Sequence, residues 1–126
     1  MPDPEQLTGG PLRVAISNAL SQVLADYTGR GPERVRTTID EDTVMCMFHG
    51  NLNRAERKLF DSGRGDLVLE MRHNVQEAMR TDLVDAVSSL TGRPVQAFMS
   101  ANHLQPDLGV ELFVLANGEP PPAGAD

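Results

Sequence analysis

The chain has 126 residues and carries 11 Lys and Arg against 18 Asp and Glu, a formal net charge of −7. This length predicts one domain with its own core, and the negative charge disfavours nucleic acid as a partner, since phosphates repel it. The single cysteine excludes an internal disulfide, and because no leader of basic then apolar residues opens the chain, we expect a cytoplasmic protein.

Both ends of the chain are rich in Pro, Gly and acidic residues. These segments, "MPDPEQLTGG" at 1–10 and "NGEPPPAGAD" at 117–126, predict disordered tails around a single folded domain at 11–116. The longest apolar run, "VMCMF" at 44–48, is far shorter than the roughly 20 residues that cross a bilayer. We therefore expect no direct membrane insertion.

The first half of the domain predicts a helix followed by two strands. From Pro11 the apolar residues recur every three or four positions, which is typical of a helix with one buried face, and Gly29 with Pro32 ends it. Residues 34–39 then alternate as a strand with one wet face. Residues 43–48 read as a central strand, because both of its faces are apolar.

The second half repeats this order after a short linking helix. Asn53 with Glu56 forms a predicted capping box that starts a helix within 52–62. A long helical stripe follows from Asp66 to the stop at Gly92. It consists of Val68, Met71, Val75, Met79, Leu83, Ala86 or Val87, and Leu90. Strands are then expected at 94–101 and 109–116, joined by a loop with a Pro-Asp turn.

The predicted order is therefore α-β-β-α-α-β-β, an α+β fold with an internal pseudo-repeat. In each half, a helix ends in Thr-Gly-Arg, at Thr28 to Arg30 and at Thr91 to Arg93, and an antiparallel hairpin follows. Short connections then favour a four-stranded antiparallel sheet with the helices on one face.

The helices can cover only one face of the predicted sheet, so the side chains of the other face would be exposed to solvent. We expect them over Val35, Ile39, Met45, Met47, Val95, Met99, Val110, Leu112 and Val114. The opposite face would then expose Cys46, Phe48, Phe98, Phe113 and Leu115, whose burial would stabilise association by several kcal/mol. The expectation is a homodimer, formed through this face or through the long helix. Alternatively, the short helix or a tail folds over it.

No residue pattern in the chain points to catalysis, a metal or a cofactor. Cys46 and His49, three apart in one strand, point to opposite faces, and a cysteine between two methionines is typical of core. Cys46, His49, His103 and Asp107 show no metal-ligand spacing. We therefore predict neither a catalytic residue nor a metal site, and no cofactor.

Arginines at the ends of helices are the candidate binding residues. Arg30 and Arg93 are related by the repeat, with Thr28 and Thr91 beside them, and Arg64 follows the short helix. One hypothesis is an anion or partner site, because guanidinium groups suit carboxylate and phosphate. The other is that each arginine caps the preceding helix or pairs with a nearby acid.

Three phrases in order carry a family resemblance: "YTGRGP" after the first helix, "GRGDLV" opening the long helix, and "LTGR" followed by "AFMS". Over 11–116 the chain resembles the small bacterial MpsC-like proteins, the third component of a sodium-translocating, membrane-potential-generating system. The resemblance implies an accessory protein associated with a membrane transport component, and it supplies no catalytic residue.

Three functional hypotheses follow. The first is a non-enzymatic cytoplasmic accessory or regulatory module of a membrane ion (Na⁺) or inorganic-carbon transport system, which self-associates and acts by binding. The second is a small-anion or nucleotide sensor, or an enzyme, with a pocket near Arg30 and Arg93. The third is nucleic-acid binding, which ranks last because the net charge is negative, although Arg34 and Arg36 extend a basic stripe from Arg30.

Overall fold

The computed structural model describes residues 6–117, and its seven elements follow the predicted order. They are α1 (Gly9–Thr28), β1 (Arg34–Asp40), β2 (Thr43–His49), α2 (Arg54–Asp61), α3 (Gly65–Thr91), β3 (Val95–His103) and β4 (Leu108–Leu115). The first helix begins two residues before the expected domain start at Pro11. Residues 1–5 and 118–126 of the expected tails lie outside the described part of the chain.

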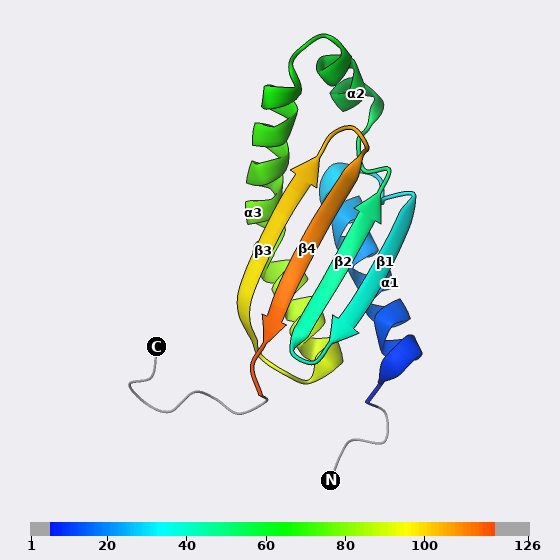
Figure 1. The fold of residues 1–126 in the computed structure, drawn as a ribbon, viewed down its shortest axis with the longest axis vertical. Helices are drawn as coiled ribbons and strands as arrows, with labels where there is room; N and C mark the ends of the chain where they lie inside the picture. Colours follow the sequence, from blue (N-terminus) through cyan, green and yellow to red (C-terminus); the bar gives the residue numbers. More distant parts are fainter. Residues whose placement is uncertain (1–5, 118–126) are drawn as a thin grey trace, which may run out of the picture.

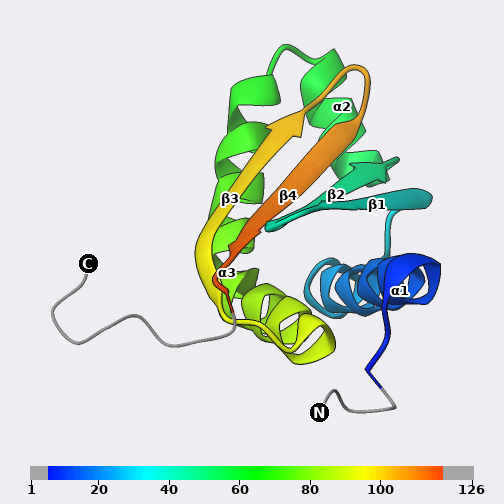
Figure 2. The same ribbon diagram turned by 60° about the horizontal axis from the view of Figure 1, so that its bottom comes forward.

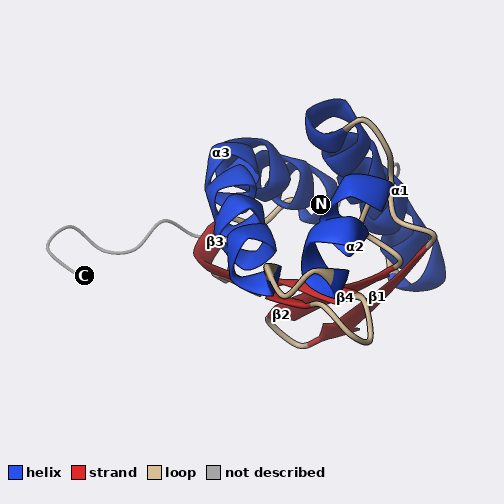
Figure 3. Ribbon diagram, turned by 90° about the horizontal axis from the view of Figure 1, so that it is seen from above, coloured by secondary structure: helices blue, strands red, loops and turns tan. Residues whose placement is uncertain are grey.

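The four strands form one antiparallel sheet in the order β1-β2-β4-β3 (Figure 1). Each hairpin supplies one edge strand, and β2 pairs with β4 where the two halves meet. Seen along the sheet, all three helices lie on the same side of the strands (Figure 3). The α+β fold with helices on one face is therefore confirmed.

The repeated Thr-Gly-Arg phrase ends α1 and α3 with the same geometry. The threonine hydroxyl donates to the carbonyl four residues earlier, at 2.7 Å for Thr28 and 2.8 Å for Thr91. The following Gly29 and Gly92 take φ angles of 85° and 70°, which glycine adopts without a Cβ penalty. The internal pseudo-repeat thus extends to the geometry of the helix ends.

The core lies between the sheet and the helices α1 and α3, which pack side by side beneath it (Figure 2). One stripe from each helix enters it, as the helical spacing predicts. The buried apolar members are Leu12, Ile16, Leu20 and Leu24 of α1 and Met79, Leu83 and Val87 of α3. Met71, placed in this stripe from the sequence, is instead 42 % exposed.

The predicted assignment of the two sheet faces is right for Val35, Ile39 and Val95, which pack against the core, but wrong for the other residues named for the two faces. Phe48, Phe98 and Phe113 face the helices and are only 1 %, 7 % and 0 % exposed, with Cys46 and Leu115 beside them. Strand periodicity states which residues share a face but not which face is covered. The aromatic face offers more apolar area, so it is the one buried. The dimer expected through these residues is therefore not available.

The short helix α2 links the halves through the predicted capping box. The Asn53 side chain accepts from the Glu56 amide at 2.8 Å, and Glu56 Oε1 accepts from the Asn53 amide at 2.9 Å. Beyond the end of the sheet, a small second apolar cluster joins this region to α3 and the β3–β4 loop. It contains Leu52, Phe60, Val68 and Leu104. None of the helices described is both long enough and apolar enough to cross a bilayer.

Candidate functional site

Arg30 connects the end of α1 to the segment after β2. Its guanidinium donates to the carbonyls of Leu52 at 2.9 Å and Gly50 at 3.1 Å. The Glu33 carboxylate lies 3.9 Å away, and both side chains are largely exposed. The main contacts of this arginine are therefore to backbone that follows its own hairpin.

Arg93 makes the corresponding connection in the second half. Its Nε donates to the Ala116 carbonyl, just after β4, at 2.8 Å. Its Nη2 lies 2.6 Å from Asp42 Oδ1 in the β1–β2 turn. This arginine thus ties the end of α3 to both hairpins.

The structure does not bring the predicted binding residues into one site. Arg30 contacts residues after the end of β2, whereas Arg93 contacts the turn before its start, so the seven residues of β2, about 20 Å, separate them. Arg64 is exposed at the start of α3, and the hydroxyls of Thr28 and Thr91 bond to their own helices. Binding at any one of them stays a prediction.

Replacing Arg30 or Arg93 with alanine is expected to lower the free energy of unfolding by about 1–2 kcal/mol, because each change removes charge-assisted bonds to backbone carbonyls. Urea denaturation measures the loss. Exposed Arg13 on α1 is the control, and Arg13→Ala should stay within about 0.5 kcal/mol. If the first two variants were as neutral as the control, the binding hypothesis for these arginines would be the better one.

Thr28 also lines a surface groove of about 200 Å³ between the end of α1, α2 and α3, together with Tyr27, Met71 and Val75. Pockets that bury small ligands usually measure about 300–1,000 Å³. The groove is therefore small for a nucleotide, and neither Arg30 nor Arg93 lines it.

Cys46 and His49 lie on opposite faces of β2, as their spacing predicts. Cys46 is fully buried, and burial raises the pKa of its thiol to about 11, so that it carries its proton at neutral pH. Within residues 6–117, no three His, Cys, Asp or Glu side chains gather as metal ligands.

The face of the sheet turned away from the helices is an open, mainly apolar surface, which we call the open face. The register of the strands sets it out in four rows running from β1 through β2 and β4 to β3. They are Asp40, Thr43, Val114 and Ala97; Thr38, Met45, Leu112 and Met99; Arg36, Met47, Val110 and Ala101; and Arg34, His49, Leu108 and His103.

Apolar side chains fill the centre of the open face, and charges lie along one edge. Met45, Met47 and Leu112 are half-buried by their neighbours, and Met99 is 53 % exposed. The charged side chains belong to β1, one of the two edge strands. A contiguous apolar centre with a polar margin is typical of an interaction surface.

A buried polar cluster lies on the opposite side of the sheet, near the start of α3. Arg72 of α3 donates to both carboxylate oxygens of Glu56, each at 2.5 Å, and to the Asn51 carbonyl at 2.6 Å. Arg72 and Glu56 are 8 % and 3 % exposed. This ion pair holds α2, α3 and the segment after β2 together.

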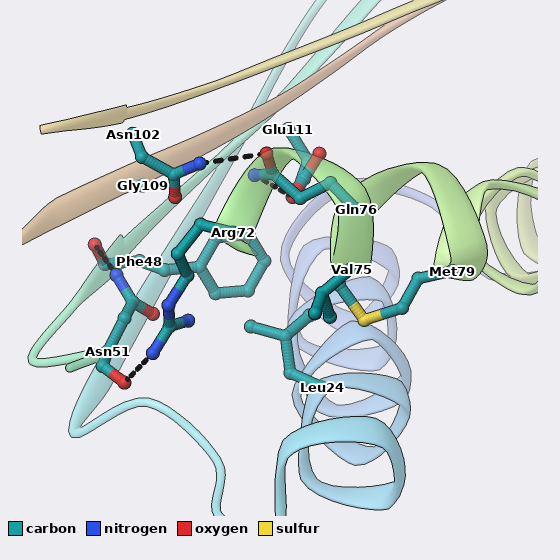
Figure 4. A pocket seen from close by; sticks show the side chains of 10 residues that line it. All are labelled: Leu24, Phe48, Asn51, Arg72, Val75, Gln76, Met79, Asn102, Gly109 and Glu111. Carbon is teal, nitrogen blue, oxygen red and sulfur yellow. Dashed lines mark hydrogen bonds between the residues drawn. The ribbon is translucent and has the colours of Figure 1, made fainter. Parts of the chain in front are cut away.

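A second part of the cluster surrounds a cavity of about 20 Å³ between α3 and the sheet (Figure 4). Gln76 of α3 donates to Glu111 Oε1 at 3.1 Å and accepts from Asn102 Nδ2 at 2.8 Å. Glu111 is 2 % exposed, and desolvation raises the pKa of its carboxyl to about 8. Such a cavity is large enough for one water molecule and no larger ligand.

The cluster was missed from the sequence, although a signal for part of it existed. Arg72 and Gln76 follow Val68 at four-residue steps and Met79 comes three residues later, so the helical period alone places them on the buried stripe. They were not included in the predicted stripe because only apolar residues were counted in it. Glu111 shares its strand face with Phe113, and the wrong face assignment placed both in water.

Comparison with known proteins identifies the family. A family model described as "Na+-translocating membrane potential-generating system (MpsC)" matches residues 8–117. "Uncharacterized protein YbcI" of Bacillus subtilis (strain 168) is 29 % identical over 109 residues, which cover 86 % of this chain and 88 % of that protein. No solved structure matches significantly. The resemblance read from the Thr-Gly-Arg phrases is confirmed, and the chain belongs to the MpsC family.

Proposed function

We propose that this protein is a non-enzymatic accessory component of a membrane Na⁺ transport system, which acts on the cytoplasmic side as a homodimer. The family match over residues 8–117 is the observation that carries the proposal, because its description names such a system. The single, fully buried cysteine is compatible with a reducing compartment.

The open face supports self-association. Four strands about 4.8 Å apart and seven residues long cover roughly 19 by 23 Å, so two copies would bury about 900 Å² in total, an area typical of a weak or transient interface. The methionines at its centre, Met45 and Met47, adapt their shape to a partner surface. Without a partner, the apolar centre of this face remains in water.

A second copy of the chain fits this face in a definite orientation. A twofold axis that runs parallel to the strands, between β2 and β4, places β1 of one copy over β3 of the other. Met45 then meets Leu112 and Met47 meets Val110, while Arg36 meets Ala101. This arrangement pairs apolar side chains. It also places the β1 strands of the two copies, which carry Arg34 and Arg36, at opposite edges of the interface.

Sedimentation of Leu112→Arg tests the dimer, because a charge at the centre of a dry interface opposes association strongly. We expect the wild type to be a dimer at tens of micromolar and Leu112→Arg to be a folded monomer. Leu69→Arg makes the same change at an exposed leucine of α3 and should remain a dimer. A monomeric wild type, or a dimeric Leu112→Arg, would contradict the open-face interface.

Co-purification tests the accessory role separately. The tagged wild type, co-expressed with the membrane component of a Na⁺ transport system, should retain that component after detergent extraction. Leu69→Arg is the matched control and should retain it equally. If the wild type retains no such component in extracts where the component is intact, the proposed role is wrong even if the protein is a dimer.

A further inference from the structure

Glu111 is a carboxyl group at the centre of the fold. It lies in β4, one of the two inner strands, and faces α3. Its Oε1 accepts from Gln76, and Gln76 in turn accepts from Asn102 of β3. A chain of polar groups thus connects β3, α3 and β4 at the place where the helix meets the sheet, as the sticks in Figure 4 show.

No cation balances a negative charge at this position in the described part of the chain. On α3, the Arg72 guanidinium is already paired with both oxygens of Glu56 from α2. On β2 the facing group is the Cys46 thiol, which is protonated. The β3 neighbour is the neutral Ser100, which, like Gln76, lowers the pKa of the carboxyl by hydrogen bonding, but by less than burial raises it.

The first helix contributes no charge either, because its buried residues are all apolar. An ionised Glu111 would therefore be an uncompensated charge in a medium of low dielectric constant, which is strongly unfavourable. The carboxyl group avoids this cost by keeping its proton. Burial is also the largest cause of its raised pKa.

The second oxygen of this carboxyl points to the same conclusion. Glu111 Oε2 has no hydrogen-bond partner, and neither has Asn51 Oδ1, another buried atom. Both residues line the cavity of about 20 Å³. A proton on Oε2 converts this acceptor into a donor, and one water molecule has room to accept from it.

We propose that Glu111 is a proton-binding site coupled to the packing of α3 on the sheet. The carboxyl group binds one proton when α3 docks on the sheet, and it releases this proton to water when the contact opens. Acid then favours the docked helix and alkali favours the open one. Only the open state hydrates the carboxylate, and this difference couples the helix–sheet contact to pH.

Cys46 provides a direct reporter for the opening. It is the only cysteine, it is fully buried, and it lies opposite Glu111 in the β2–β4 register. A thiol reagent reaches it only when the helix layer separates from this part of the sheet, where α1 lies near as well, because Ser17 of α1 and Cys46 both contact Thr37. Because a Glu111→Gln variant keeps the same thiol, the ratio of the two labelling rates cancels the pH dependence of the thiol chemistry.

The experiment compares labelling by a dipyridyl disulfide in the wild type and Glu111→Gln between pH 5 and pH 9. The ratio of wild-type to variant rates should rise up to about tenfold per pH unit, because opening releases one proton, and level off above about pH 8. Glu70→Gln, which removes an exposed carboxylate from α3, should behave as the wild type. A ratio that stays constant with pH overturns the proposal.

Two further measurements test the proposal if the variant folds poorly or if labelling occurs through global unfolding. If Glu111→Gln folds poorly, the wild-type rate divided by that of the unfolded chain gives the opening constant at each pH, and this constant must rise between pH 5 and pH 8. Low urea separates local from global opening. Labelling that accelerates with the full urea dependence of global unfolding would show that the helix does not open by itself, and the proposal would fail.

Discussion

Glu56→Ala is expected to lower the free energy of unfolding by about 3–5 kcal/mol, because it leaves the buried guanidinium of Arg72 without a counter-charge. The same substitution also removes one of the two capping-box bonds at the start of α2, the one from the Asn53 amide to Glu56 Oε1, while the Asn53 side chain still accepts from the amide of residue 56. Against a total of about 5–15 kcal/mol for a domain of this size, the variant should be close to unfolding at 37 °C.

Urea denaturation of a double-mutant cycle distinguishes the ion pair from the loss of a side chain. Glu56→Leu with Arg72→Met replaces both charges with apolar groups and should recover much of the loss, since no buried charge then stays unpaired. Glu70→Ala, at an exposed site of α3, should change stability by less than about 0.5 kcal/mol. A cost below 1 kcal/mol for Glu56→Ala would show that water screens this pair.

Glu111→Gln should gain stability relative to the wild type by about 3–4 kcal/mol on going from pH 5 to pH 8. The pKa of this carboxyl is raised from 4.5 to about 8 in the folded chain, so the folded state holds its proton where the unfolded state has lost it. Wild-type stability from this group is therefore complete below the unfolded pKa and is lost as the pH rises through the folded one.

Denaturant titrations of both proteins at pH 5, 6, 7 and 8 give the difference directly, because all other titrating groups are common to the two chains. The difference should increase by up to about 1.4 kcal/mol per pH unit in the middle of this range. A difference that does not depend on pH would show that Glu111 is ionised in the folded protein. The proton-linked docking of α3 would then have no basis.

The elements of this fold are predictable because their signals are local. The φ angle that glycine tolerates at Gly29 and Gly92 ends both long helices. The reciprocal bonds of Asn53 and Glu56 start α2 within four residues of sequence. Each of these signals works between neighbours in the chain, so the sequence is sufficient to find it.

The binding residues proposed from the sequence show the opposite case. Arg30 and Arg93 occupy equivalent places in the repeat, yet their partners are carbonyls twenty or more residues away, such as Leu52 and Ala116. Nothing in the local pattern states whether a guanidinium at a helix end meets a ligand or distant backbone. The answer depends on where the strand ends lie after the chain has folded.

Sequence patterns were sufficient to predict the order of helices and strands, the duplicated corners and the family, because helical and strand periods, caps and glycine stops act over a few residues. The choice of the covered sheet face, which makes Phe113 core and Leu112 surface, followed from packing in three dimensions. This packing also brought Arg72 to Glu56 and placed Glu111 beneath α3. These outcomes depend on which of the two apolar sheet faces buries more area against the single layer of helices. That area is summed over four strands that are spread along the sequence, so no short segment determines it.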